Sequence, residues 1–323
     1  MKLLVTGAAG FIGSHFVEQV YAPHRIVVLD KLTYAGRRRN VPDHVEELII
    51  GDICDPVIVR EAMEGVDAVI NFAAESHVDR SIADQAAFLQ TNVVGTGVLL
   101  DAVRELGIER FVQISTDEVY GSIPSGSAAE DWLLSPSSPY SASKAAADLL
   151  VGAHVATHGL DAVICRGSNN YGPGQFPEKL IPLLIDRAFH CQPLPIYGDG
   201  LQIRNWLYVD DFCRGIRRVL EQGRAGEVYN VGGPDELTNL EVVQRIIGVF
   251  RSGHVGLPSG VTEDLIEHAE DRLGHDRRYS LDSSKIEEEL GWFPRVSFGV
   301  GLEETIGWQQ VKWMTESVTA TNS

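Results

Sequence analysis

The sequence predicts an α/β fold: a doubly wound parallel sheet followed by a smaller C-terminal lobe. Short apolar runs alternate with helical patterns through the first half of the chain, which is typical of βαβ units. A glycine-rich turn from Gly7 to Gly13 joins the first apolar run to the first helical pattern, as in Rossmann-type domains. After Arg166 the chain changes to segments rich in Gly, Pro and Asn, which indicates a second lobe.

The predicted elements of the first part follow in chain order. Residues 2–6 are a buried strand, a helix covers 14–21, and residues 25–29 form the second strand because Ile, Val and Leu dominate there. Further apolar runs predict strands at 47–50, 67–71, 110–115 and 161–165, with helices at 91–106 and 140–157. Because ligands bind outside the carboxyl ends of such strands, we expect one rim to collect Gly7, Asp30, Asp52, Ala73 to Ser76 and Thr116 to Glu118.

The second part is divided by its loops. Loops at 168–174 and 193–200 bracket a helix at 177–190, and residues 238–251 and 282–290 are predicted helices of the second lobe. We therefore expect a first domain at 1–166 with a return of about 206–231, a second lobe at 167–205 and 232–316, and a disordered Ser/Thr-rich tail at 317–323.

Composition excludes several classes of protein. The chain has 323 residues, of which 44% are hydrophobic, enough for more than one modest core. No run approaches the roughly 18 uninterrupted apolar residues of a membrane span, and glycines interrupt the apolar start too soon for a signal peptide. The formal net charge of −18 argues against nucleic-acid or anionic-membrane partners. An anionic small ligand would therefore need a locally basic pocket.

Cysteine usage points to a reducing compartment. Cys54, Cys165, Cys191 and Cys213 are scattered and form no C-x-x-C pair. Neither a disulfide framework nor a zinc site is indicated. We expect a cytoplasmic protein without a metal.

The glycine-rich turn predicts a dinucleotide site. Its backbone N–H groups, at a helix N-terminus, would let a pyrophosphate approach closely. Asp30 ends the second strand, where a carboxylate would bind the adenosine ribose 2′-hydroxyl and repel a 2′-phosphate. The pattern favours NAD over NADP. Lys31 and the arginines at 37–39 weigh slightly towards NADP. The alternative, that the glycine turn serves only tight packing and binds no cofactor, does not account for Asp30.

Two further clusters carry chemistry. Asp117 and Glu118 follow the predicted strand at 110–115. Since side chains of an extended strand alternate between faces, the chain must leave strand geometry for both to reach one ligand. Tyr140 and Lys144 are four residues apart on a predicted helix, so the ammonium should lower the pKa of the phenol from about 10. Either cluster alone could be a solvated surface. Together at one rim they predict an acid, a base and an activated phenol.

With these residues identified, the chain resembles the extended short-chain dehydrogenase/reductase superfamily, and within it the dTDP-glucose 4,6-dehydratases. The glycine turn and the Tyr/Lys pair mark only the superfamily. Thr116 to Glu118 together with Phe176 to Lys179 is far more specific to the dehydratases. The similarity covers nearly the whole chain, through segments at 7–13, 30–36, 51–53, 73–80, 115–121, 138–144, 168–173, 176–182 and 275–279.

The resemblance implies a lyase that converts dTDP-glucose to dTDP-4-keto-6-deoxy-glucose and water by an internal NAD redox cycle. Tyr140 would remove the C4 hydroxyl proton, tuned by Lys144 and assisted by Thr116, while hydride leaves C4. Glu118 would then remove the C5 proton, Asp117 would protonate the departing C6 hydroxyl, and hydride would return to C6. Such an elimination needs one protonated and one ionised carboxyl, and neighbouring carboxyls in a closed site separate their pKa values.

The resemblance also implies the ligand contacts. NAD would lie on Gly7, Gly10, Phe11, Ile12, Gly13, Asp30, Lys31, Thr33, Gly36, Asp52, Ile53, Ala73, Ala74, Thr91, Tyr140, Lys144 and Asn170. The nucleotide sugar would bind in the second lobe on Ser76, Thr116, Asn169, Glu178, Lys179, Tyr197, Arg204, Asn239, Arg272 and His275. Lys179, Arg204 and Arg272 would supply the local positive charge that a diphosphate requires. A homodimer would pair the helices at 91–106 and 140–157 of each subunit into a four-helix bundle.

Other functions remain alternatives. A nucleotide-sugar 4-epimerase shares the cofactor site and the Tyr/Lys pair but has no need for an acid–base pair at C5 and C6. A redox-sensing NAD-binding regulator would typically lack the tyrosine or the lysine. A dehydratase acting on a UDP- or CDP-sugar also stays open, because the chain departs from the usual dehydratase pattern at Gln202 to Trp206, around Tyr208 and at Leu273.

Overall fold

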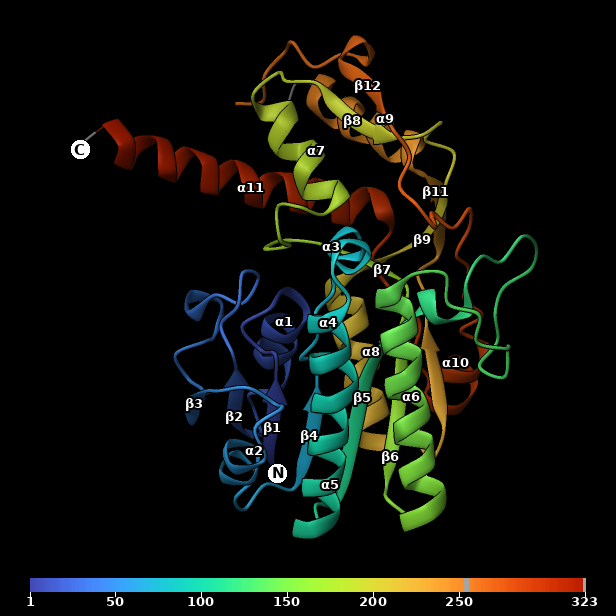
Figure 1. The fold of residues 1–323 in the computed structure, drawn as a ribbon. Coiled ribbons are helices and arrows are strands. Elements are labelled where there is room, and N and C mark those ends of the chain that lie inside the picture. Colours follow the sequence, from blue (N-terminus) through green and yellow to red (C-terminus); the bar gives the residue numbers. More distant parts are fainter. Residues whose placement is uncertain (253–255, 322–323) are drawn as a thin grey trace.

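The computed structural model describes residues 1–252 and 256–321. It consists of two lobes, one above the other in Figure 1. The lower part is built on a parallel sheet of seven strands from the described chain, in the order β10-β6-β5-β4-β1-β2-β3. All six pairings are parallel. The doubly wound sheet predicted from the sequence is confirmed. The strands are β1 (Lys2–Thr6), β2 (Arg25–Asp30), β3 (Glu47–Ile50), β4 (Ala68–Asn71), β5 (Arg110–Thr116), β6 (Ala162–Gly167) and β10 (Val228–Val231).

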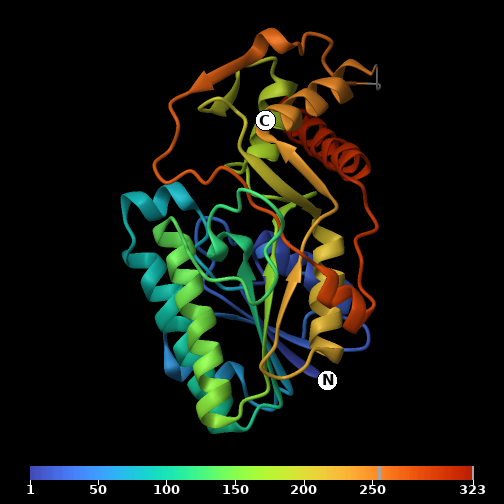
Figure 2. The same ribbon diagram turned by 90° about the vertical axis from the view of Figure 1, so that its right-hand side faces the viewer.

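Helices cover both faces of this sheet, which is why its strands are almost continuously apolar. One face packs on α1 (Phe11–Val20) and α8 (Val209–Gln222) through a core that includes Phe16 and Phe212. The other face packs on α2 (Pro56–Ala62), α5 (Thr96–Leu106) and α6 (Pro139–His158). In Figure 2 the long helices α5 and α6 stand side by side on the left of the sheet, and α8 lies on its right.

The second lobe has its own core above the carboxyl ends of the strands. A three-stranded sheet is formed by β7 (Asn169–Tyr171), β9 (Ile203–Tyr208) and β11 (Asp235–Thr238), and β8 (Leu194–Tyr197) pairs with β12 (Ile266–Ala269). Helices α7 (Leu180–Phe189), α9 (Asn239–Arg251) and the start of α11 (Phe298–Thr321) bury their apolar faces against these strands. The chain crosses between the lobes at β6–β7, at β9–α8, after β10, after β12 and again just before α11.

Two predictions about the C-terminal part are wrong. Helix α10 (Ser284–Leu290) belongs to the first domain, because Ile286 and Trp292 lie in the core with α8 and β10. The sequence pattern showed that one face of this helix is buried but not which partner buries it. Helix α11 continues to Thr321 where a disordered tail was predicted. No Gly or Pro stops it after Gly307, and propagating a helix adds one hydrogen bond for each residue fixed; residues 322 and 323 of the predicted tail lie outside the described residues.

The helical run before β5 is not one regular helix. It consists of α4 (Ala86–Phe88), a π-helix η2 (Leu89–Gly95) and α5, whereas the sequence predicted a plain helix at 91–106. Its length and apolar composition would suffice to cross a membrane, but 44% of its most apolar window is buried inside the protein. It packs on α2 and α6, so its composition is explained by core packing and by the exposed face discussed below.

Candidate active site

The Asp117-Glu118 pair leaves strand geometry at the position where the sequence required it. Strand β5 ends at Thr116, and Asp117–Tyr120 form a 3₁₀ turn, η3. The Thr116 hydroxyl caps this turn by accepting a hydrogen bond from the Glu118 N–H at 3.3 Å. Because the turn replaces the strand's alternation, both carboxyls lie on the same cavity.

Helix α6 holds Tyr140 and Lys144 beneath the same cavity. It starts with a reciprocal capping box between Ser138 and Ser141, and Pro139 takes the first helical position. Tyr140 and Lys144 are 9% and 5% exposed, so both are part of the core. The ammonium donates to the carbonyl of Ile114 at 2.6 Å, which ties the helix to the end of β5.

The prediction that Lys144 lowers the pKa of Tyr140 is wrong for this structure. Burial raises the pKa of the Tyr140 phenol, and the negative charges of Glu118 and Asp117 raise it further. Burial also lowers the pKa of Lys144 to about 8. The phenol faces two carboxyls, while the lysine is occupied by a backbone carbonyl, so the helical spacing alone did not determine the balance.

The two carboxyls have different electrostatic surroundings. Burial and the neighbouring Glu118 charge raise the pKa of Asp117 to about 8, opposed by Arg204. Burial also raises the pKa of Glu118, but three cations oppose it: Arg272, Lys179 and Arg204. Opposite charges favour the ionised form. Asp117 is therefore the better proton donor of the pair and Glu118 the better base.

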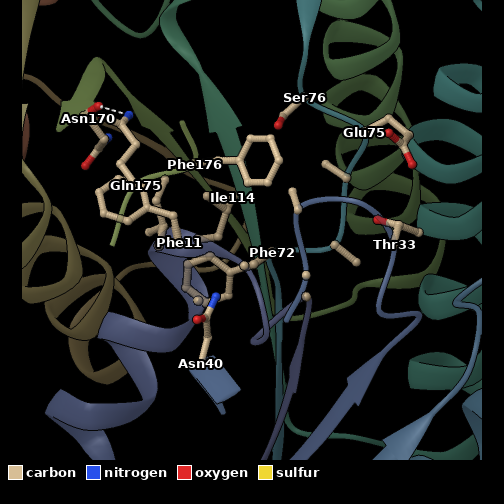
Figure 3. A pocket seen from close by; sticks show the side chains of 18 of the residues that line it. Phe11, Thr33, Asn40, Phe72, Glu75, Ser76, Ile114, Asn170, Gln175 and Phe176 are labelled. Carbon is tan, nitrogen blue, oxygen red and sulfur yellow. Dashed lines mark hydrogen bonds between the residues drawn. The ribbon is translucent and has the colours of Figure 1, made fainter. Parts of the chain in front are cut away.

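These side chains line one end of a cavity of about 620 Å³ between the two lobes. Its other end lies over the glycine turn and the end of β2. In Figure 3, Phe176 lies between Gln175 on the left and Glu75 on the right, with Phe11 and Phe72 below it. Every residue predicted to contact NAD lines this cavity: Gly7, Gly10, Phe11, Ile12, Gly13, Asp30, Lys31, Thr33, Gly36, Asp52, Ile53, Ala73, Ala74, Thr91, Tyr140, Lys144 and Asn170.

The glycine turn fits a dinucleotide pyrophosphate. A Cβ at Gly7, which has φ +69°, would lie 2.6 Å from the backbone nitrogen of Ala73, and a Cβ at Gly13 would lie 2.6 Å from the Gly7 carbonyl oxygen. The turn is therefore packed directly on the backbone just after β4. The first N–H groups of α1 point out of the helix without intrahelical partners, which is the arrangement that binds a phosphate.

The end of β2 fits the ribose of an NAD molecule. The Asp30 carboxylate accepts from the N–H groups of Ala9 and Leu32 at 2.9 and 2.8 Å, so it is fixed beside the glycine turn with lone pairs to spare. Two of the arginines that weighed towards NADP have other partners: Arg37, at the cavity, lies over the Phe176 ring, and Arg38 donates to the Val41 carbonyl.

The π-helix shapes the middle of the cavity wall. Asn92 in this segment is buried, and its amide bonds both the N–H and the carbonyl of Glu75 as well as the Ser143 hydroxyl. This one side chain links the loop after β4 to helix α6. Thr91 beside it faces the cavity. Such π-bulges occur frequently at functional sites, but the sequence gives no pattern for them.

The predicted substrate residues divide into two groups. Ser76, Thr116, Asn169 and Lys179 line the cavity. The others lie outside its lining, in the second lobe or at its border: Glu178, Tyr197, Arg204, Asn239, Arg272 and His275. Of these, Arg204 and Arg272 still act electrostatically on Glu118. Glu178 instead pairs with Arg80 at 3.0 Å and with His77 at 3.3 Å.

Four side chains stack beside the cavity in an arrangement that the sequence did not predict, and two of them, Arg37 and Phe176, line it. Arg80 lies over the Tyr34 ring at 3.8 Å, Tyr34 contacts Phe176 edge to face, and Arg37 lies over Phe176. Together they join the loop after β2, helix α3 (Val78–Ala83) and the loop before α7. Each lies within or beside a quoted segment of the resemblance, but only the fold brings them together.

Two of the positions that depart from the dehydratase pattern serve the scaffold. Asn205 donates to the Gly233 carbonyl and accepts from its N–H, and Gln202 donates to Asp271. Leu273 is 77% exposed. None of the three lines the cavity.

Comparison with known proteins shows that the chain is similar to nucleotide-sugar dehydratases. A family model described as GDP-mannose 4,6 dehydratase matches residues 4–305. The chain is 49% identical over 319 residues to a dTDP-glucose 4,6-dehydratase of Streptomyces niveus, covering 95% of this chain and 92% of that protein. A solved dTDP-glucose 4,6-dehydratase from Streptomyces venezuelae with NAD bound superposes with a TM-score of 0.92 at 48% identity, covering 97% and 98% of the two chains. A UDP-glucose 4-epimerase from Thermotoga maritima reaches 0.89 at 27% identity, covering 97% and 100%.

Proposed function

The chain belongs to the GDP-mannose 4,6 dehydratase family of extended short-chain dehydrogenases/reductases, and from this premise we propose that it is a dTDP-glucose 4,6-dehydratase that uses NAD. The observation that carries the proposal is the pair Asp117 and Glu118 on a 3₁₀ turn at the cavity, next to Tyr140. An epimerase, which stops at the 4-keto stage, has no use for an acid and a base at C5 and C6.

The residues divide the reaction into two proton-transfer stages. Tyr140 accepts the proton of the C4 hydroxyl as that carbon is oxidised, with Thr116 beside the phenol. Bound NAD⁺ supplies the hydride acceptor for C4 and the hydride donor for C6. The C4 ketone then acidifies C5, so that Glu118 can remove the C5 proton while Asp117 protonates the departing C6 hydroxyl.

Electrostatics suits these assignments. Asp117, with its raised pKa of about 8, holds a proton more strongly than an ordinary aspartate and can give it to a leaving group. Glu118 faces Arg272, Lys179 and Arg204, which favour its ionised form. Lys144 holds helix α6 against the end of β5 by donating to the Ile114 carbonyl. The product is dTDP-4-keto-6-deoxy-glucose plus water, without net oxidation.

The same three cations identify the substrate class. In a chain with a formal net charge of −18, Lys179, Arg204 and Arg272 gather at the site and provide the positive field that a nucleoside diphosphate needs. Curated relatives at 48–50% identity are dTDP-glucose 4,6-dehydratases, which supports dTDP-glucose as the substrate.

Incubation with dTDP-glucose tests the function. Purified protein loaded with NAD, and given no other reductant, is expected to lower the mass of the sugar nucleotide by one water. The Glu118→Gln variant, which keeps the shape of the side chain but not its basicity, is expected to form no dehydrated product. An unchanged mass together with a galactose epimer on chromatography would instead establish an epimerase. Turnover of UDP-glucose or CDP-glucose alone would reassign the nucleotide.

We also propose that the protein is a homodimer that pairs α5 and α6 of each subunit in a four-helix bundle. The outer face of α6 carries small and apolar residues at alternating spacings of three and four, namely Ala142, Ala146, Leu149, Ala153 and Ala156. Leu149 is 66% exposed, and Val94 on the neighbouring π-helix is 47% exposed. Small residues at this spacing let helices approach closely.

We further propose a cytoplasmic location. The four cysteines, Cys54, Cys165, Cys191 and Cys213, are all free, as expected for a chain kept in a reducing compartment. Fractionation of the producing cells, with detection of the native chain, tests this.

A further inference from the structure

The proposed cycle returns its electrons but leaves one proton displaced. Tyr140 gains the proton of the C4 hydroxyl, and Asp117 loses a proton to the departing C6 hydroxyl. Glu118 needs no correction, because it takes the C5 proton and gives it back to C5 when hydride reaches C6. Each turnover therefore requires one proton to pass from Tyr140 to Asp117.

The Thr116 hydroxyl lies between these two groups. It donates to Oδ1 of Asp117 at 3.2 Å, and on its other side it lies within interaction range of the Tyr140 phenol. Because its own proton points to Asp117, the hydroxyl oxygen presents a lone pair to the phenol. Tyr140, Thr116 and Asp117 thus form a chain of one donor, one donor–acceptor and one acceptor.

The surroundings of Asp117 favour transfer within the protein over transfer to solvent. Asp117 is 3% exposed, and its second oxygen, Oδ2, is buried without a hydrogen-bond partner. The carboxyl torsion is broad, so its two oxygens can exchange places. One oxygen can therefore take a proton from Thr116 and later present it to the C6 hydroxyl.

We propose that Thr116 relays the C4 hydroxyl proton from Tyr140 to Asp117, so that this proton leaves the enzyme in the water formed at C6. The inference rests on the proposed dehydratase function and deepens it. The residues named as a base for the first stage and an acid for the second become two ends of one proton path.

The step balances in atoms and electrons. The C4–H bond breaks and its electron pair leaves as hydride to the cofactor, while the C4 hydroxyl proton passes to the Tyr140 oxygen. The Tyr140 proton passes to Thr116, and the Thr116 proton passes to Asp117. On elimination, the C6–O bond breaks and takes up the proton held by Asp117. Tyr140 and Thr116 then carry their protons again, and Asp117 is ionised as before.

The charges around Asp117 suit an intermediate proton carrier. Glu118 on the same turn and Tyr140 on α6 lie near it, and Arg204 on β9 opposes the negative charge of Glu118. Their balance with burial sets the pKa of Asp117 at about 8, well above that of an ordinary carboxyl near 4. Asp117 therefore competes for the proton more strongly than an ordinary aspartate would.

The oxidation half-reaction tests the relay. The probe dTDP-6-deoxyglucose has no C6 hydroxyl to eliminate, so its reaction stops at the C4 ketone, and reduced nicotinamide can be followed by absorbance in a stopped-flow instrument. Thr116→Val, which has the same shape without the hydroxyl, should slow this step about a hundredfold. Thr116→Ser keeps the hydroxyl and should restore most of the rate. Asp117→Asn should also slow the step, although it plays no part in oxidation under the simpler scheme.

The pH profile separates a relay from a structural role. The wild-type oxidation rate should rise with pH as Asp117 ionises and becomes an acceptor, and Asp117→Asn should lose that rise. Oxidation by Asp117→Asn at the wild-type rate would overturn the relay and leave the dehydratase function intact. A wild type that produces no reduced nicotinamide from this probe, and no dehydrated product from dTDP-glucose, would overturn both.

Discussion

Replacing Gly7 by alanine tests two reasons for glycine at this position: its positive φ and its close approach to the backbone of Ala73. Gly7 has φ +69°, and Gly65, in the exposed turn before β4, has nearly the same φ of +64°. A Cβ at Gly65 would meet no atom within 4 Å, whereas one at Gly7 would lie 2.6 Å from the Ala73 nitrogen and 2.7 Å from its Cα. Gly65→Ala is therefore a matched control for the conformational cost alone.

The magnitudes follow from this comparison. Alanine in the left-handed region costs about 1–2 kcal/mol, so Gly65→Ala should lower the free energy of unfolding by that amount. At Gly7 the added Cβ would be too close to Ala73 by most of an ångström, because ordinary van der Waals contact begins at 3.4 Å. Neither backbone segment can move without disturbing β1 or β4. Overpacking of this kind adds about 1–3 kcal/mol, so Gly7→Ala should lose about 2–5 kcal/mol.

The assay is thermal or urea unfolding with and without NAD. A ligand that binds only the folded state stabilises it in proportion to the logarithm of its affinity. NAD should stabilise the wild type and Gly65→Ala equally. It should stabilise Gly7→Ala less, because the turn must move away from Ala73 and out of register with a pyrophosphate. Equal losses of stability in the two variants, with equal stabilisation by NAD, would refute the view that contact with Ala73 fixes the turn.

Three other predictions concern charge and assembly. Asp148→Asn should lower the free energy of unfolding by about 3–5 kcal/mol. The guanidinium of Arg166 is 4% exposed and lies 2.9 Å from Asp148, so the variant leaves it without a counter-charge. Retention of wild-type stability in urea would contradict this. Asp117→Asn should change how stability depends on pH. The folded-state pKa of Asp117 is raised to about 8, so wild-type stability should decline from about pH 4 to about pH 8 as the buried group is forced to ionise, and the variant should lose that part of the decline in melting temperature. Leu149→Glu should weaken the proposed dimer and shift light scattering towards the monomer, while an unchanged mass would place the interface elsewhere.

The sheet could be predicted from the sequence because burial on both faces leaves an unmistakable record. Strands such as β1 and β2 are runs of Leu, Val and Ile, and each is followed by its ligand-facing residue, Gly7 after β1 and Asp30 at the end of β2. The rim then follows from the parallel order of the strands, without any knowledge of loop conformation. For this reason the complete predicted set of NAD contacts lies on one cavity.

What the sequence could not give depends on contacts between distant segments. Asn92 binds Glu75 and Ser143 from inside a π-helix, and hydrophobic periodicity does not encode such an irregular turn. The placement of α10 failed because a single amphipathic face fits either core. The pKa of Tyr140 was predicted in the wrong direction because only Lys144 was considered, whereas the fold adds burial and two carboxyls.

The cations at the site couple recognition of the nucleotide to the chemistry at C5. Arg272, Lys179 and Arg204 lower the pKa of Glu118 against the effect of burial. They therefore favour its ionised form, and also weaken it as a base. A diphosphate that binds among them neutralises part of their charge and so raises the basicity of Glu118 while the sugar is in place. Binding energy from a part of the substrate that does not react is thereby converted into reactivity at C5. A sugar without the diphosphate would meet the same carboxylate at its least basic, so the local positive charge selects for the nucleotide-linked substrate.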